Sequence, residues 1–160
     1  WGAQAGLYHN FGINKRDLEK KLFGIYPHYK TTLAEPLLRG FDDIFPAPQS
    51  RHTEICTDPL KAHKDLTILA EGEESGVLLV KSNDNRQIFM TGHLEYDTET
   101  LGNEYRRDLD KGLPIEMPVN YFPENDPWQK PRSTWRSHAH LFYSNWLNYY
   151  VYQETPFEFV

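Results

Sequence analysis

The stretch IFMTGHLEYD, residues 88–97, joins an apolar run to a glycine and then to a histidine and a carboxylate. Such a run predicts a buried strand, and open α/β sheets place their functional sites where strands end. His93 and Glu95 are two residues apart, so in an extended chain their side chains point the same way. A neutral imidazole accepts a proton from a thiol or hydroxyl, and a neighbouring carboxylate fixes its tautomer. The stretch therefore predicts the base and acid of a catalytic triad, with an ordinary surface His and Glu as the alternative.

A nucleophile for this pair does not stand at an obvious position. Cys56 is the only cysteine, and the surrounding TEICTD, residues 53–58, contains no small-residue turn to expose it. We therefore expect Cys56 to be a buried or idle thiol, with a nucleophile paired to His93 as the alternative. The opening WGAQAGL, residues 1–7, has the small residues expected beneath a turn that presents a reactive side chain. It has no methionine and no charged leader, which is typical of the middle of a longer protein.

Short apolar runs at residues 66–70, 77–80 and 87–91 predict a meander of strands. Turns rich in Gly, Asn, Asp, Glu and Ser separate these runs. The runs are apolar throughout instead of alternating with polar residues, which predicts that both faces of the sheet are covered. Residues 22–29 predict one more short strand, at an edge or an exit because Pro27 has no N–H to donate.

Helical periodicity predicts helices over residues 2–11 and 99–111, and a third from residue 133 or 134 until Pro156. Glycine and proline punctuate residues 30–53 and 113–132, so both segments are expected to be irregular loops. Long irregular segments in a compact domain are often functional.

The composition fits one soluble globular domain over residues 1–160, with 39% hydrophobic and 14% aromatic residues. No stretch approaches the ~20 apolar residues of a membrane span. The net charge of −6 argues against general affinity for nucleic acid. A single cysteine cannot form an internal disulfide and favours a cytoplasmic location.

Polar residues in several segments are candidates for ligand binding. Arg107 points away from the apolar stripe of its predicted helix, which fits either a solvated face or a clamp for a carboxylate substrate. The segments RGFDD, residues 39–43, and PQSRH, residues 48–52, suit a polar pocket or, equally, ordinary loop polarity. His138 and His140 have no Cys or carboxylate at ligand spacing, so no metal site is predicted and His138 is expected in a core or an interface.

These segments together resemble the homoserine O-succinyltransferase (trans-succinylase) family, which also includes homoserine O-acetyltransferases. The resemblance spans essentially the whole chain. Its motifs are WGAQA (1–5), RGFDD (39–43), SR (50–51), TGH (91–93), EYD (95–97), NYFP (120–123), WRSH (135–138) and NWLNYYVYQ (145–153).

This resemblance implies an α/β fold, the C-terminal half of a class I glutamine-amidotransferase-like (flavodoxin-like) sandwich within a larger acyltransferase domain. It also implies a nucleophilic cysteine immediately before Trp1, in an N-terminal half of the same enzyme. His93 resembles the general base of the family and Glu95 its triad acid. Lys21, Ser50 and Arg107 match its substrate-binding residues. One departure is Leu94, which stands where proline is usual and can alter the rigidity of the loop.

The implied reaction is ping-pong acyl transfer from acetyl-CoA or succinyl-CoA to the hydroxyl of L-homoserine, in methionine biosynthesis. It requires acyl-CoA as a co-substrate and no metal or redox cofactor, and a homodimer is expected. Serine acetylation on the same scaffold is a close rival, because pockets discriminate one methylene by only ~1–3 kcal/mol. The scaffold also suits a glutamine amidotransferase-like hydrolase, and a chain without its nucleophile suits an inactive binding fragment.

Overall fold

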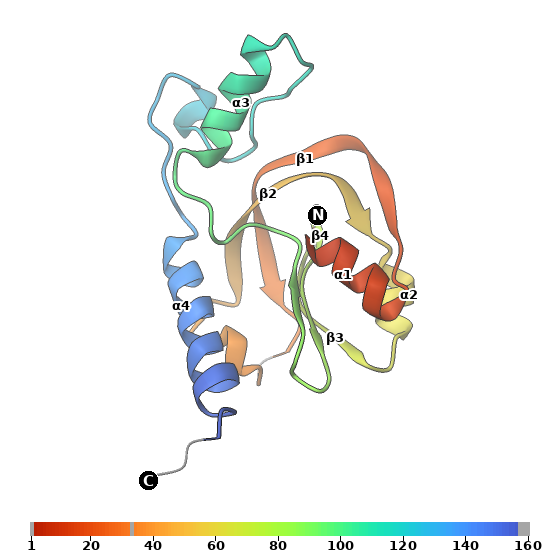
Figure 1. The fold of residues 1–160 in the computed structure, drawn as a ribbon. Helices are drawn as coiled ribbons and strands as arrows, with labels where there is room; N and C mark the ends of the chain where they lie inside the picture. The colour runs from red at the N-terminus through yellow and green to blue at the C-terminus, as the bar shows by residue number, and fades with distance from the viewer. Residues whose placement is uncertain (1, 33, 157–160) are drawn as a thin grey trace.

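The computed structural model describes residues 2–32 and 34–156, and its strands form one curled antiparallel sheet (Figure 1). The strand order is β2-β1-β3-β4-β5, so β2 and β5 form the two edges. The strands are β1 (Lys15–Lys30), β2 (Ile44–Ile55), β3 (Leu66–Gly72), β4 (Gly76–Ser82) and β5 (Ile88–Met90). The predicted meander is confirmed as β3, β4 and β5.

The sequence interpretation was wrong for residues 44–53, which form most of β2 instead of part of an irregular loop. Pro46 lies opposite Pro27 of β1 in the antiparallel register. A proline cannot donate a ladder hydrogen bond, but at the edge of a sheet this loss is small. β1 is also longer than predicted, because its polar first part, Lys15–Lys20, extends the strand beyond the apolar run. Polar exposed strands of this kind lack the apolar signal on which the prediction relied.

The helices are α1 (Gly2–Phe11), α2 (Thr57–Ala62), α3 (Thr100–Asp110) and α4 (Arg136–Trp146). Single 3₁₀ turns occur at Pro36–Leu38 and Pro123–Asn125. The last predicted helix is α-helical only until Trp146 and continues as a π-helical turn, η3 (Leu147–Tyr152). The short helix α2 was not predicted. No helix among the described residues is long and apolar enough to cross a membrane.

Two hydrophobic clusters cover the two faces of the sheet, as the continuous apolar runs predicted. One cluster places Leu7 of α1 with Val80 of β4 and Phe89 of β5. The other places Phe142 of α4 with Leu79 of β4. Figure 1 shows α1 and α4 on opposite sides of the sheet. The end of β5 therefore packs against α1 on one face and is turned toward α4 on the other.

A close backbone approach at Gly24 ties the segment before residue 120 to the middle of β1. Gly24 has φ +140°, and a Cβ there would lie 2.3 Å from the carbonyl oxygen of Val119. Ile25 N–H donates to that carbonyl at 2.8 Å, and Val119 N–H donates to Phe23 O at 2.9 Å. Only glycine permits this contact, which brings the loop after α3 back against the sheet.

Candidate active site

The imidazole of His93 and the carboxylate of Glu95 are hydrogen bonded, with 2.7 Å between Nδ1 and Oε1. The pair forms through a turn and not through the extended chain assumed from the sequence: Tyr96 N–H bonds to His93 O at 3.4 Å, closing the turn over Leu94 and Glu95. Leu94 is buried in the core at this turn. Because Nδ1 faces the carboxylate, Nε2 is the nitrogen left to exchange a proton with a reactant.

Ionisation of Glu95 is favoured by its partner. Burial opposes the charged form, but hydrogen bonds from His93 and from its own backbone N–H, together with the charge of His93, hold the pKa of Glu95 below its usual value. The carboxylate is thus suited to fix the imidazole tautomer and to stabilise the imidazolium.

The backbone before His93 is packed so closely that any side chain at residue 92 would force its neighbours to shift. A Cβ on Gly92 would lie 2.6 Å from Leu78 Cδ1, 2.7 Å from Gln49 Nε2 and 3.0 Å from Pro48 O. His93 N–H donates to that same Pro48 carbonyl at 2.9 Å. The end of β5 is therefore attached directly to β2, and this attachment fixes the position from which His93 projects.

The three residues expected to bind substrate converge on one carboxylate, Glu104 of α3. Lys21 Nζ lies 2.7 Å from Glu104 Oε1. Ser50 Oγ donates within 3.0 and 2.9 Å of its two oxygens. Arg107, one helical turn further along α3, lies 3.8 Å from Glu104 Oε1. The structure thus brings together Lys21 from β1, Ser50 from β2 and Arg107 from α3.

Glu104 was missed by the sequence interpretation, although its position three residues before Arg107 places both on one helix face. Its side chain is 19% exposed and that of Lys21 is 16% exposed, whereas that of Arg107 is 54% exposed. Arg107 also donates from Nε to Asp108 at 2.7 Å. Arg107 therefore stands at the mouth of the cluster, and Glu104 and Lys21 lie inside it.

Two cavities meet at His93 and Thr91. The smaller, of about 560 Å³, includes the polar residues Ser50, Glu104 and Arg107, together with Ala3 and Gln4 from the start of α1. The larger, of about 1050 Å³, lies between β5 and α4 and includes Gly2 and Ala3 of α1. His93 therefore lines both cavities together with Ala3 at the start of α1, and it shares the smaller cavity with Glu104.

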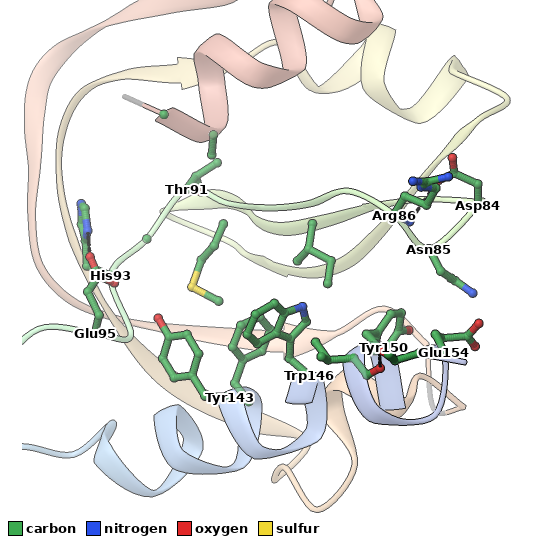
Figure 2. Close-up of a pocket in the computed structure, with 18 residues that line it drawn as sticks. Asp84, Asn85, Arg86, Thr91, His93, Glu95, Tyr143, Trp146, Tyr150 and Glu154 are labelled. Carbon is green, nitrogen blue, oxygen red and sulfur yellow. Dashed lines mark hydrogen bonds and ion pairs between the residues drawn. The ribbon is translucent and has the colours of Figure 1, made fainter. Parts of the chain in front are cut away.

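Aromatic side chains line one wall of the larger cavity. Figure 2 shows Tyr143, Trp146 and Tyr150 projecting from α4 and η3 toward β5. His93 and Glu95 stand at one end of the cavity and Arg86 at the other.

Several further residues singled out from the sequence lie apart from this centre. Cys56 is partly buried at the start of α2 and lines neither cavity. His138 is a core residue, as expected, and its Nε2 lies 3.2 Å from Asp42 Oδ2. Of the two polar segments, residues 50–52 line the smaller cavity, whereas residues 39–43 line neither. No group of three His, Cys, Asp or Glu side chains suited to a metal ion occurs in residues 2–32 and 34–156.

A family model described as homoserine O-succinyltransferase matches residues 1–157. The chain belongs to the homoserine O-succinyltransferase family. It is 58% identical over 160 residues to the homoserine O-acetyltransferase of Agathobacter rectalis, covering 100% of this chain and 52% of that protein. It is 55% identical over 158 residues to the homoserine O-acetyltransferase of Lysinibacillus sphaericus, covering 99% of this chain and 51% of that protein. The chain spans about half the length of these relatives.

Solved structures confirm the predicted fold class. A glutamine amidotransferase from Methylobacillus flagellatus superimposes with a TM-score of 0.61 at 14% identity, over 91% of this chain and 59% of that one. A glutamine amidotransferase from Thermotoga maritima superimposes with a TM-score of 0.54 at 14% identity, over 89% of this chain and 54% of that one. This family member therefore has a class I glutamine-amidotransferase-like α/β fold, to which the described strands contribute an antiparallel sheet.

Proposed function

We propose that this chain carries the base, the acid and the acceptor-binding residues of an enzyme that transfers an acyl group from acyl-CoA to the hydroxyl of L-homoserine. Family membership supports the reaction class. The observation that carries the proposal is the position of His93, paired with Glu95 and bordering both the start of α1 and the cavity that holds Glu104.

The proposed nucleophile is a cysteine immediately before Trp1. Its thiol passes a proton to His93 Nε2, and the thiolate attacks the thioester carbonyl of acyl-CoA. Collapse of the tetrahedral intermediate breaks the carbon–sulfur bond to CoA, which leaves as the thiol with the proton from His93. The acyl group is then held on the cysteine as a thioester. Glu95 stabilises the imidazolium at each proton transfer.

Homoserine enters the second half-reaction as a zwitterion. The Glu104 carboxylate has the charge to accept its ammonium group, and Lys21 and Arg107 have the charge to bind its carboxylate. Its hydroxyl loses a proton to His93 as the oxygen attacks the thioester, and that proton leaves with the cysteine thiol. Without substrate, Glu104 neutralises Lys21, so binding exchanges one set of ion pairs for another.

Acetyl-CoA is the donor that we propose first, because the relatives at 55–58% identity are named acetyltransferases. Succinyl-CoA remains the alternative, since the matching family model is named for succinyl transfer. We further propose that the remaining half of the enzyme supplies the cysteine, and that the protein is a cytoplasmic homodimer. Light scattering of the intact protein tests the dimer.

The decisive assay measures release of CoA thiol by a polypeptide that includes the segment before Trp1. We expect release with homoserine and acetyl-CoA or succinyl-CoA, and loss of release in a His93→Ala variant. No release with either donor would reject acyl transfer. Serine in place of homoserine tests the closest competing acceptor. Ammonia release from glutamine without acyl-CoA would instead favour a hydrolase.

A further inference from the structure

The rings of His93 and Tyr96 are stacked. Their centroids are 4.1 Å apart and their planes differ by 9°. Both rings project from the same turn, since Tyr96 N–H bonds to His93 O. The turn that forms the His93–Glu95 pair therefore also places an aromatic face against the imidazole.

Tyr96 is attached to the core more firmly than Glu95 is. Trp135 is 1% exposed, and its indole N–H donates to the Tyr96 carbonyl at 3.0 Å. Tyr96 also packs against the larger hydrophobic cluster. The side chain of Glu95, by contrast, is 53% exposed. Water competes with an exposed hydrogen bond, so the carboxylate alone leaves the plane of the imidazole weakly fixed.

The charged surroundings favour a neutral tyrosine ring. Burial, then the charges of Glu104 and Glu95, raises the pKa of Tyr96 to about 12. The ring therefore keeps the electron-rich face of a neutral phenol at working pH, and such a face attracts a cation. The remaining charged or titratable groups around His93 are Glu95 beside it, Arg51 and His52 of β2, Glu104 and Arg107 of α3, and Tyr143 of α4.

We propose that Tyr96 is a positioning residue for His93: its ring fixes the plane of the imidazole and stabilises the imidazolium that forms during proton transfer. The role in acyl transfer rests on the proposed function, whereas the effect on His93 itself does not. The contribution comes from the aromatic face and not from the hydroxyl, because the contact is ring on ring.

The first experiment measures the pKa of His93 by NMR, in the intact polypeptide with isotope-labelled histidine, for wild type, Tyr96→Phe and Tyr96→Met. Loss of the aromatic face in the methionine variant is expected to lower the pKa of His93 by about 0.5–1 unit. The phenylalanine variant should titrate like wild type. Greater access of water alone would raise the pKa, so an increase or no change in Tyr96→Met overturns the proposal.

The second experiment compares the kinetics of the same variants. Tyr96→Met is expected to lower kcat about tenfold, to shift the acid limb of the pH profile downward and to leave the KM for homoserine within about twofold. Tyr96→Phe should keep kcat within about threefold. A change confined to the KM for homoserine, or an equal loss in both variants, would show that Tyr96 only lines the acceptor cavity or acts through its hydroxyl.

A third variant tests the proposal if Tyr96→Met does not fold. Trp135→Phe removes the indole donor to the Tyr96 carbonyl while keeping both stacked rings, and it should lower the pKa of His93 by a smaller amount in the same direction. An unchanged pKa would mean that the core does not hold the stack. If wild type released no CoA with any donor, the proposed function would fail. The NMR comparison would still decide whether the Tyr96 ring acts on His93.

Discussion

Ser50 of β2 and Glu104 of α3 are joined by a forked contact, with the serine hydroxyl 3.0 and 2.9 Å from the two carboxylate oxygens. The two residues are 54 positions apart in the sequence. The contact holds the carboxylate in one orientation beside Lys21, and both residues line the smaller cavity next to His93.

Glu104→Gln should weaken acceptor binding more than it slows the chemical steps. The amide keeps the shape of the side chain but loses the charge that pairs with an ammonium group, a loss of roughly 1.5–3 kcal/mol for a charged hydrogen bond. We therefore expect the KM for homoserine to rise about 10–100-fold with kcat within a few-fold. Steady-state kinetics with varied homoserine measures this. Glu99→Gln, at the more exposed start of α3, is the matched control, and an unchanged KM in Glu104→Gln would contradict the assignment.

Glu95→Gln should lower kcat about 10²–10³-fold while leaving the KM for homoserine nearly unchanged. The amide can present its N–H₂ to His93 Nδ1, which favours the wrong imidazole tautomer and gives no charge to stabilise the imidazolium. Because the pKa of Glu95 lies below its usual value, Glu95 should not set the acid limb of the wild-type profile. Asp97→Asn, an exposed neighbour, should behave like wild type. A loss of less than about threefold in Glu95→Gln would remove Glu95 from the triad.

His28 should make the protein less stable as the pH falls from 6.5 toward 4. Burial lowers the pKa of His28 from 6.5 to about 4, so in this range the unfolded chain binds a proton that the folded chain excludes. Each unit of pKa difference corresponds to 1.36 kcal/mol, so up to ~3 kcal/mol of the free energy of unfolding is lost by pH 4. Above 6.5 the contribution is constant.

Urea unfolding at several pH values measures the His28 effect. His28→Gln should flatten the curve between pH 4 and 6.5, whatever its effect on stability at pH 7. His9→Gln, on the exposed face of α1, should keep the wild-type slope. A His28→Gln variant with an unchanged slope would assign the acid sensitivity to other groups.

Gly92→Ala should damage both stability and activity. The added methyl group would meet Leu78 and Gln49 side chains within 2.7 Å, and overpacking of this kind costs about 1–3 kcal/mol. The backbone shift that relieves it moves His93, so kcat should fall more than the loss of stability explains. Thermal melting and kinetics below the melting temperature separate the two effects. Gly112→Ala is the control: φ +66° strains it by ~1–2 kcal/mol, but nothing lies within 4 Å of the new methyl group, so activity should persist.

The three longer helices and the meander of strands were readable from the sequence because their signals are local. The apolar stripe of the helix predicted over residues 99–111 depends only on neighbours along the chain, and so do the apolar runs of β3, β4 and β5. β2 was not predicted, because the sequence interpretation used only local signals and the prolines of this strand indicate a loop locally. Its place at the edge of the sheet is what makes these prolines acceptable. The π-helical end of α4 likewise has no periodic signal of its own.

What the sequence determined by itself was the pairing of His93 with Glu95, since the two residues are two positions apart and one turn brings their side chains into contact. It also determined the family, through motifs that keep their order along the chain. Only the tertiary structure decided that Glu104 gathers Lys21, Ser50 and Arg107, and that the Tyr96 ring, supported by Trp135, lies flat on His93. These contacts depend on strand register and on packing between distant segments, and no local pattern specifies either.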